Sequence, residues 1–251
     1  MSVATYTSDE MMAVAGARQI GDGKVCLIGI GLPGAAALLA KHHHAPNAVL
    51  IYESGVVDTN PETTPLSIGD DGLAVSSRTI VSLPDMFNYW LQGGRIDIGF
   101  LGAAQIDRFG NINTTVIGSY DKPKVRLPGS GGAPEIAAAA GEIIVIVRHS
   151  ARALVDKIDF VTSVGHMDGS TDRGSLGFLG SGPSRLVTDL GILSSDPDTN
   201  EFVLTGLYPG ATVEDAVHKT GWELAVSDDL VELAEPSEDE LRILRKVSAQ
   251  A

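Results

Sequence analysis

The order strand, glycine turn, helix, strand within residues 24–52 constrains the fold more than any other feature of this sequence. An apolar run at Lys24–Ile30 predicts a strand, and the glycines of Gly29–Gly34 predict a turn. The pattern then predicts a helix over 35–43 and a second strand at Ala48–Tyr52. Two strands joined by one helix over so short a stretch are typical of a right-handed crossover between parallel neighbours. We therefore expect an α/β fold with an open, mostly parallel sheet flanked by helices.

The rest of the chain continues this alternation. We expect further helices at 8–20, 86–91, 135–140, 212–220 and 235–247, and strands at 96–101, 112–117, 143–147 and 160–164. Two antiparallel hairpins are expected within residues 96–117 and 185–204, and an irregular loop over 60–77. No linker divides the chain, so we expect one domain over residues 1–251 that ends in a helical tail over 235–251.

Composition and charge argue against several classes of protein. A net charge of −14 disfavours nucleic acid or an anionic membrane surface as a partner. The longest apolar runs are strand-sized and fall short of the roughly 20 residues of a membrane span. The first residues lack a secretory signal pattern, and the single cysteine, Cys26, lies in an apolar strand, as expected in a reducing compartment. We expect a cytoplasmic protein.

Glu53 follows the second strand and is open to two chemistries. It lies nineteen residues after Gly34, where a dinucleotide-binding fold places the acid that holds a ribose hydroxyl. Alternatively, Glu53 is a nucleophile on a sharp turn, and the glycines let a substrate or another backbone segment approach closely. Pro33 disfavours the dinucleotide, because it stiffens a turn whose backbone N–H groups would hold the pyrophosphate.

A second glycine loop, Gly129-Ser130-Gly131-Gly132, precedes the helix expected at 135–140. Consecutive backbone N–H groups in such a loop can hold a developing oxyanion. Two glycine loops and an acid suit acyl chemistry, in which a carboxylate attacks a carbonyl. That both loops merely turn the chain stays open at this point.

Other polar residues give weaker signals. Adjacent imidazoles of His42-His43-His44 point about 100° apart on a helix, so we expect a surface position and no metal site. His166 is open to a structural role or a substrate contact. The amides of Gln105 and Asn113 can hydrogen-bond a polar substrate, and the basic cluster Lys122–Arg126 can receive an anion or form a solvated loop.

Five short motifs follow one another between about Tyr6 and Trp222. They are Gly29-x-Gly31-Leu32-Pro33, Glu53-Ser54-Gly55, Gly102-Ala103-Ala104-Gln105-Ile106-Asp107, Phe109-Gly110-Asn111-Ile112-Asn113 and Gly129-Ser130-Gly131-Gly132-Ala133. In order and rough spacing they resemble the beta subunits of class I coenzyme A transferases, of the glutaconate CoA-transferase type. The stretch from Tyr89-Trp90-Leu91-Gln92-Gly93-Gly94-Arg95 through Lys124-Val125-Arg126 is more similar still to the 3-oxoadipate CoA-transferase branch.

The resemblance implies a CoA-transferase (NagB/RpiA-like) fold and roles for specific residues. It implies Glu53 as the nucleophile that forms a glutamyl-CoA thioester, and the N–H groups of Gly131 and Gly132 as oxyanion donors. Substrate and CoA contacts are expected at Gly31, Leu32, Pro33, Gly102, Gln105 and Asn113. Coenzyme A thioester is then a substrate, no further cofactor or metal is expected, and the partner is a separate alpha subunit in a heterodimer or larger heteromer.

Several functions stay open within this resemblance. We expect transfer of CoA from succinyl-CoA to 3-oxoadipate, with glutaconate or another short dicarboxylate as the alternative acceptor. Relatives on this fold that act as hydrolases or decarboxylases lack the acid at this position, so Glu53 favours a transferase. A dinucleotide-binding oxidoreductase and a scaffold subunit without chemistry of its own are more distant alternatives.

Overall fold

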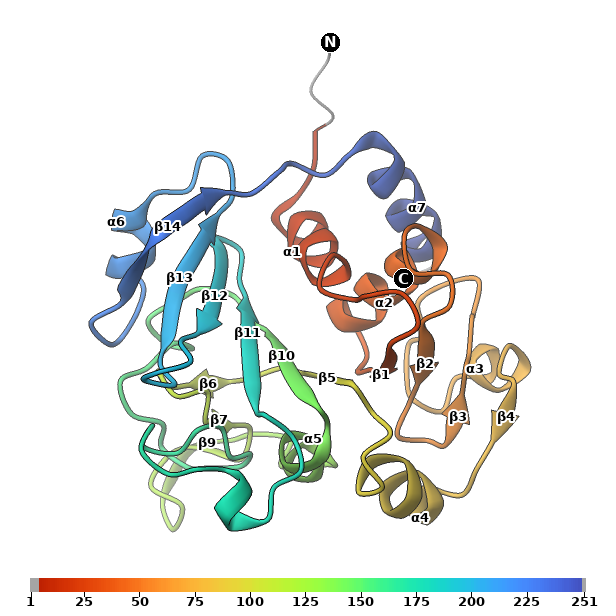
Figure 1. Cartoon of the computed structure of the whole chain (residues 1–251), viewed down its shortest axis with the longest axis horizontal. Helices are drawn as coiled ribbons and strands as arrows, with labels where there is room; N and C mark the ends of the chain where they lie inside the picture. The colour runs from red at the N-terminus through yellow and green to blue at the C-terminus, as the bar shows by residue number, and fades with distance from the viewer. Residues whose placement is uncertain (1–4, 250–251) are drawn as a thin grey trace. The chain divides into compact units, whose positions relative to one another are not determined.

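The computed structural model describes residues 5–249, which form two compact units. The first unit comprises the chain up to Leu101 together with the segment from Glu235 onward, and the second comprises Gly102–Ala234 (Figure 1). Within the described residues, every helix is too short or too polar to cross a lipid bilayer. The one-domain prediction for residues 1–251 stays a prediction.

The sheet of the first unit has the predicted parallel crossover at its centre. Its strands run in the order β5 (Ile98–Leu101), β1 (Val25–Leu27), β2 (Val49–Ile51), β3 (Val56–Val57) and β4 (Thr79–Ile80). Strand β1 is parallel to both β2 and β5, with Val25 opposite Val49. Antiparallel pairs then add β3 and β4 at one edge, because the chain reverses directly after β2.

Three helices pack together in this unit: α1 (Ser8–Ala17), α2 (Leu32–His42) and α7 (Glu238–Ser248) (Figure 1). Helix α1 begins at Ser8, as expected, with Thr7 as its cap, and ends at Ala17, three residues before the predicted end. The Thr7 hydroxyl accepts from the Glu10 N–H at 3.2 Å, and the Glu10 carboxylate accepts from the Thr7 N–H at 2.8 Å. This reciprocal pair satisfies two donors that every helix start leaves open.

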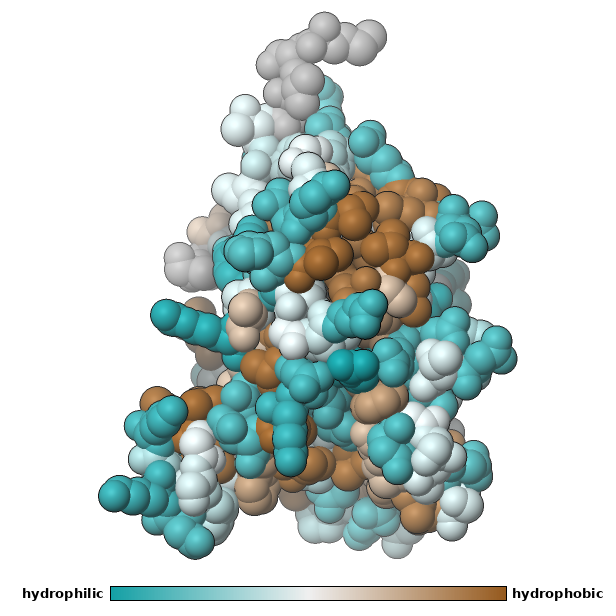
Figure 2. Space-filling model, turned by 90° about the vertical axis from the view of Figure 1, so that its left-hand side faces the viewer, coloured by the Kyte–Doolittle hydropathy of each residue, from teal (hydrophilic) through white to brown (hydrophobic). Residues whose placement is uncertain are grey.

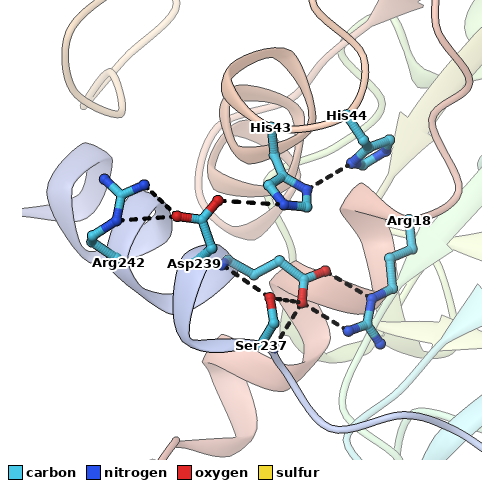
Figure 3. Close-up of polar contacts among 7 residues, drawn as sticks. Arg18, His43, His44, Ser237, Asp239 and Arg242 are labelled. Carbon is cyan, nitrogen blue, oxygen red and sulfur yellow. Dashed lines mark hydrogen bonds and ion pairs between the residues drawn. The ribbon is translucent and has the colours of Figure 1, made fainter.

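Polar contacts fix the tail helix α7 to the start of the chain (Figure 3). The Arg18 guanidinium donates to both carboxylate oxygens of Glu240, at 2.9 and 2.8 Å, and the Ser237 N–H and hydroxyl donate to the same carboxylate. Asp239 accepts from Arg242 and lies 3.6 Å from the His43 ring. The expected helical tail is therefore an integral part of the first unit.

The remaining helices of this unit are short. They are α3 (Asp71–Val75), α4 (Leu83–Asp85) and a π-helical turn, η1 (Met86–Leu91), which continues α4. The segment 60–77, expected to be irregular, contains α3, because the Asp70 carboxylate accepts from the Gly72 N–H and caps it.

The second unit carries a mixed sheet of five strands. These are β10 (Glu142–Ile146), β11 (Pro183–Val187), β12 (Gly191–Ser195), β13 (Phe202–Leu207) and β14 (Ala225–Glu232), with helices α5 (Ala133–Ala139) and α6 (Val213–His218). The outer pairs are parallel and the inner pairs antiparallel. The prediction of a single hairpin for 185–204 is wrong in detail, because this segment contributes to three strands, β11, β12 and β13. The turn between β11 and β12 is held by the Thr188 hydroxyl, which accepts from the N–H groups of Leu190 and Gly191.

Smaller elements complete this unit. The predicted hairpin within 96–117 is confirmed by the pairing of β6 (Gln105–Ile106) with β7 (Ile112–Asn113), and β8 (Val116–Gly118) pairs with β9 (Pro123–Arg126). A 3-10 turn, η2, covers Gly174–Leu176. The strand predicted at 160–164 is wrong, because the N–H groups of Thr162 and Ser163 both donate to the Ile112 carbonyl and leave only an isolated bridge.

Strand β14 ends the sheet of the second unit and exposes apolar side chains. Val226 is 37% exposed and Val231 is 52% exposed. Figure 2 shows one side of the molecule, on which hydrophobic residues gather in one area among mostly hydrophilic neighbours. An unpaired strand edge with apolar side chains is a surface that another chain can cover.

Candidate active site

Glu53 lies in the four-residue connection, Tyr52-Glu53-Ser54-Gly55, that joins β2 to β3. The Tyr52 N–H donates to the Val56 carbonyl at 3.2 Å, and the Gly55 N–H donates to the Tyr52 carbonyl at 3.0 Å. The turn therefore opens directly at the carboxyl end of β2, where open α/β sheets place their ligand-binding residues. Glu53 is half-buried there.

Gly55 is required by the shape of this turn. Its φ of +99° is unfavourable for any residue with a side chain, and a Cβ atom would lie 2.1 Å from the Val81 carbonyl oxygen. The Gly55 carbonyl in turn accepts from the Val81 N–H at 2.9 Å. The segment after β4 thus holds the loop that carries Glu53.

The first glycine loop packs against the residue before Glu53. Helix α2 begins at Leu32, with Gly31 as its cap at φ +85° and Pro33 at its second position, rather than at Ala35 as expected. Proline favours a helix start because its fixed φ is already helical. A Cβ on Gly34 would lie 3.4 Å from the Gly29 carbonyl oxygen and 3.6 Å from the Tyr52 hydroxyl. Tyr52 therefore connects the glycine loop to the Glu53 turn.

Both neighbours of Glu53 carry buried hydroxyl groups. Among the residues that the structure describes, the hydroxyl oxygens of Tyr52 and Ser54 have no hydrogen-bond partner. Burial raises the pKa of Tyr52 well above its ordinary value, so its hydroxyl keeps its proton and can donate. The sequence did not single out these two residues, because a tyrosine that ends an apolar strand is typical of an ordinary core position.

The second glycine loop lies in the second unit, directly before α5. Thr114 fixes its start: the Thr114 hydroxyl donates to the Gly129 carbonyl at 2.8 Å, and the Gly129 N–H donates to the Thr114 carbonyl at 2.9 Å. Gly131 is exposed, with φ +51°, and Gly132 is the cap of α5. Within residues 5–249, neither the Gly131 N–H nor the Gly132 N–H donates to a backbone carbonyl, and their role as oxyanion donors stays a prediction.

The amides of Gln105 and Asn113 bind each other across the β6–β7 pair. The Asn113 amide donates to the Gln105 side-chain oxygen at 2.7 Å, and the Gln105 amide donates to Asp159 at 3.1 Å. Both residues are buried, so these bonds brace the hairpin. Gly102 lies just before this hairpin with open space where a side chain would be. Substrate contacts at these three residues stay a prediction.

The histidines have structural surroundings. His166 is buried, and its ring lies 3.1 Å from the Pro183 carbonyl. The two ring nitrogens of His149 lie 3.1 and 2.8 Å from the hydroxyls of Thr188 and Thr220. Burial lowers the pKa of His149 to about 4, against a smaller opposing effect of Asp189. The His44 ring lies 3.1 Å from the Ile20 carbonyl oxygen, and the His43 ring lies 3.6 Å from an Asp239 carboxylate oxygen.

The first unit has a cavity of about 490 Å³ that Glu53 does not line. It is lined by His42, Arg242 and Lys246 together with Glu62. Lys246 lies in the last turn of α7, where a positive charge complements the negative end of the helix, whereas burial, Lys246 and Lys41 lower the pKa of His42. In the basic cluster Lys122–Arg126, residues Pro123–Arg126 form β9, and Arg126 packs over the Tyr120 ring.

Comparisons with known proteins agree on one family. Residues 9–219 match the model of the coenzyme A transferase family. The chain is 52% identical to the B subunit of 3-oxoadipate CoA-transferase from Pseudomonas knackmussii, over 99% of this chain and 95% of the relative. It is 40% identical to the B subunit of glutaconate CoA-transferase from Acidaminococcus fermentans, over 96% and 92% of the two chains.

Solved structures lead to the same family. The crystal structure of glutaconate CoA-transferase from Acidaminococcus fermentans superposes with a TM-score of 0.91 at 38% identity, covering 97% of this chain and 95% of that one. The decarboxylase AibA/AibB superposes with a TM-score of 0.84 at 27% identity, covering 98% and 96%. The predicted CoA-transferase fold is confirmed, and the chain belongs to the coenzyme A transferase family.

Proposed function

We propose that this chain is the B subunit of a two-subunit CoA-transferase that moves CoA from succinyl-CoA to 3-oxoadipate. The position of Glu53 carries the proposal: a carboxylate at the tip of a tight loop, at the carboxyl end of a parallel strand and beside a glycine loop. The 52% identity to the B subunit of a 3-oxoadipate CoA-transferase supports the substrate. Family membership favours the nucleophile over the ribose ligand as the role of this acid.

The proposed reaction runs through Glu53 in two exchanges. The Glu53 carboxylate attacks the thioester carbonyl of the donor, which expels CoA thiolate and leaves a mixed anhydride. The thiolate then attacks the glutamyl carbonyl, which releases the donor acid and forms a glutamyl-CoA thioester. The acceptor carboxylate reverses both steps and leaves as the new CoA thioester, so each bond that breaks is matched by one that forms.

Each exchange passes through a negatively charged tetrahedral intermediate. We assign the N–H groups of Gly131 and Gly132 to stabilise that oxyanion, which is supported by their lack of a backbone acceptor within residues 5–249. Loss of one such donor lowers the rate about 10²–10³-fold in enzymes of this kind. The main-chain segment Gly31–Pro33 contacts the substrate in the same proposal.

An alpha subunit completes the proposed enzyme. The named relatives are B subunits, which supports a partner of this kind. The exposed valines of β14 offer an apolar edge that such a partner can cover. The lone, buried Cys26 fits the reducing conditions of the cytoplasm, where we place the reaction.

Trapping of the thioester tests the proposal. The assembled complex is incubated with succinyl-CoA and then with borohydride, which reduces a glutamyl thioester to an alcohol. Peptide mass spectrometry should locate a mass loss at Glu53 in the wild type and none in Glu53→Gln, which should also lose turnover. Glu62→Gln, an exposed acid of the same unit, is the matched control and should behave as the wild type. Full turnover by Glu53→Gln would refute the nucleophile.

Glutaconate or another short dicarboxylate is the second candidate acceptor. The 40% identity to the B subunit of a glutaconate CoA-transferase supports it. Initial rates with 3-oxoadipate, glutaconate and related acids, each with the same donor, decide between the two. Release of free acid or CO₂ without transfer would indicate instead a hydrolase or decarboxylase on this fold.

A further inference from the structure

The Tyr52 hydroxyl is a buried donor without an acceptor. Tyr52 is fully buried, and among the described residues nothing accepts its hydroxyl proton. A buried polar group left unpaired destabilises the fold, so native proteins rarely keep one without a reason. Tyrosine to phenylalanine would remove the group and keep the ring, yet the chain retains the hydroxyl next to its proposed nucleophile.

The Tyr52 hydroxyl lies near the start of α2, which no side chain caps. Gly31 caps α2 but has no side chain to accept a hydrogen bond, and Pro33 has no N–H. The N–H groups of Leu32 and Gly34 therefore lie in the first turn of α2, where a helix offers no internal acceptor. The Tyr52 hydroxyl lies 3.6 Å from the position of the missing Cβ of Gly34.

We propose that the first turn of α2 and the Tyr52 hydroxyl form a binding site for one carboxylate oxygen of the acid substrate. Three donors lie there, two backbone N–H groups and one O–H, beside the Gly29 carbonyl oxygen. The helix start adds a positive partial charge, which favours an anionic oxygen over a neutral one. This inference rests on the proposed function for the identity of the ligand as a carboxylic acid.

The local geometry suits a small ligand. Gly31 is exposed with no heavy atom within 4 Å of where a Cβ would be, so an oxygen can reach the helix start from solvent. Gly34 is buried and places no side chain between α2 and the Tyr52 hydroxyl.

Acetate is the probe for this site, because it is the simplest carboxylate. The full chain carries ¹⁵N in its backbone and ¹³C at the tyrosine ring carbon that bears the hydroxyl. We expect acetate to shift the Gly34 amide and the Tyr52 carbon saturably at constant ionic strength, and acetamide to have little effect. Tyr52→Phe should weaken acetate binding about tenfold or more, the value of one hydrogen bond to a charged group. Tyr208→Phe, another buried tyrosine, is the control and should bind as the wild type.

Two results would overturn the site. One is a wild-type titration with no saturable shift, which would mean that a bound water alone satisfies the hydroxyl. The other is equal acetate affinity in Tyr52→Phe and the wild type. The wild-type titration needs no variant, so it decides even if Tyr52→Phe fails to fold. Acetate binding without any transferase activity would refute the proposed function alone, and transferase activity without acetate binding would refute the site alone.

Discussion

Gly55→Ala tests how the Glu53 loop is held. The new Cβ would lie 2.1 Å from the Val81 carbonyl oxygen, so that oxygen must retreat by about 0.9 Å to reach 3.0 Å, the shortest separation that real Cβ atoms show. A side chain at φ +99° costs about 1–3 kcal/mol, and loss of the hydrogen bond from the Val81 N–H to the Gly55 carbonyl costs about 1 kcal/mol. We expect the free energy of unfolding to fall by about 2–4 kcal/mol, a large part of the 5–15 kcal/mol typical of a folded domain.

Urea unfolding followed by circular dichroism measures this loss. Gly94→Ala is the matched control, because Gly94 has φ +68° and open space around its missing Cβ. Gly94→Ala should therefore lower the free energy of unfolding only through the unfavourable backbone conformation, by about 1 kcal/mol. A Gly55→Ala loss no larger than that of Gly94→Ala would refute the claim that contact with Val81 holds the loop. Because the loop carries Glu53, the assembled Gly55→Ala enzyme should also lose most of its turnover.

Two further predictions concern stability and pH. Burial lowers the pKa of His149 to about 4, so as the pH falls the unfolded chain binds a proton at this side chain before the folded chain does. The free energy of unfolding should therefore fall by about 2 kcal/mol as the pH drops from 6.5 towards 4. In a plot of the urea midpoint against pH, His149→Gln should flatten this part of the curve. Burial disfavours the Glu240 carboxylate, but hydrogen bonds from Arg18 and Ser237 outweigh it and hold its pKa near 2. The ionised Glu240 carboxylate should add about 2 kcal/mol to the free energy of unfolding, in full above pH 4.5 and less as the pH falls towards 2. Glu240→Gln should remove this pH dependence. An unchanged plot of the urea midpoint against pH would contradict the pairing of Glu240 with Arg18.

The parallel crossover was predictable because its signals are local. Glycines, Pro33 and two apolar runs mark β1, α2 and β2 in one short stretch. Strands β3 and β4 were missed because each has only two residues, too few to show a strand pattern in the sequence, and each is a strand only through its hydrogen bonds to the strand beside it. Strand β14 was missed because its mostly exposed sequence mixes apolar and polar residues without alternation, and pairing with β13 alone makes it a strand.

The site was predictable only in part. The distance from Gly34 to Glu53 singled out the acid, and the tight loop agrees with a nucleophile on a strand-end turn. Tyr52 and Ser54 were not predictable, because a hydroxyl is known to lack a partner only once every neighbour is placed. The same holds for Gln105 and Asn113, whose mutual hydrogen bond depends on the register of β6 against β7.

The anchoring of α7 has a consequence for the order in which the chain folds during synthesis. The first unit needs residues on both sides of Gly102–Ala234, so the Glu53 loop lies in a unit that is incomplete until the last helix has left the ribosome. At about 5–20 residues per second, the intervening segment takes roughly 7–27 seconds to make. Throughout that interval the α1 and α2 surfaces that α7 will cover stay exposed, and a chaperone or a nascent neighbour can reach them. A stop codon before Glu238 would make that exposure permanent.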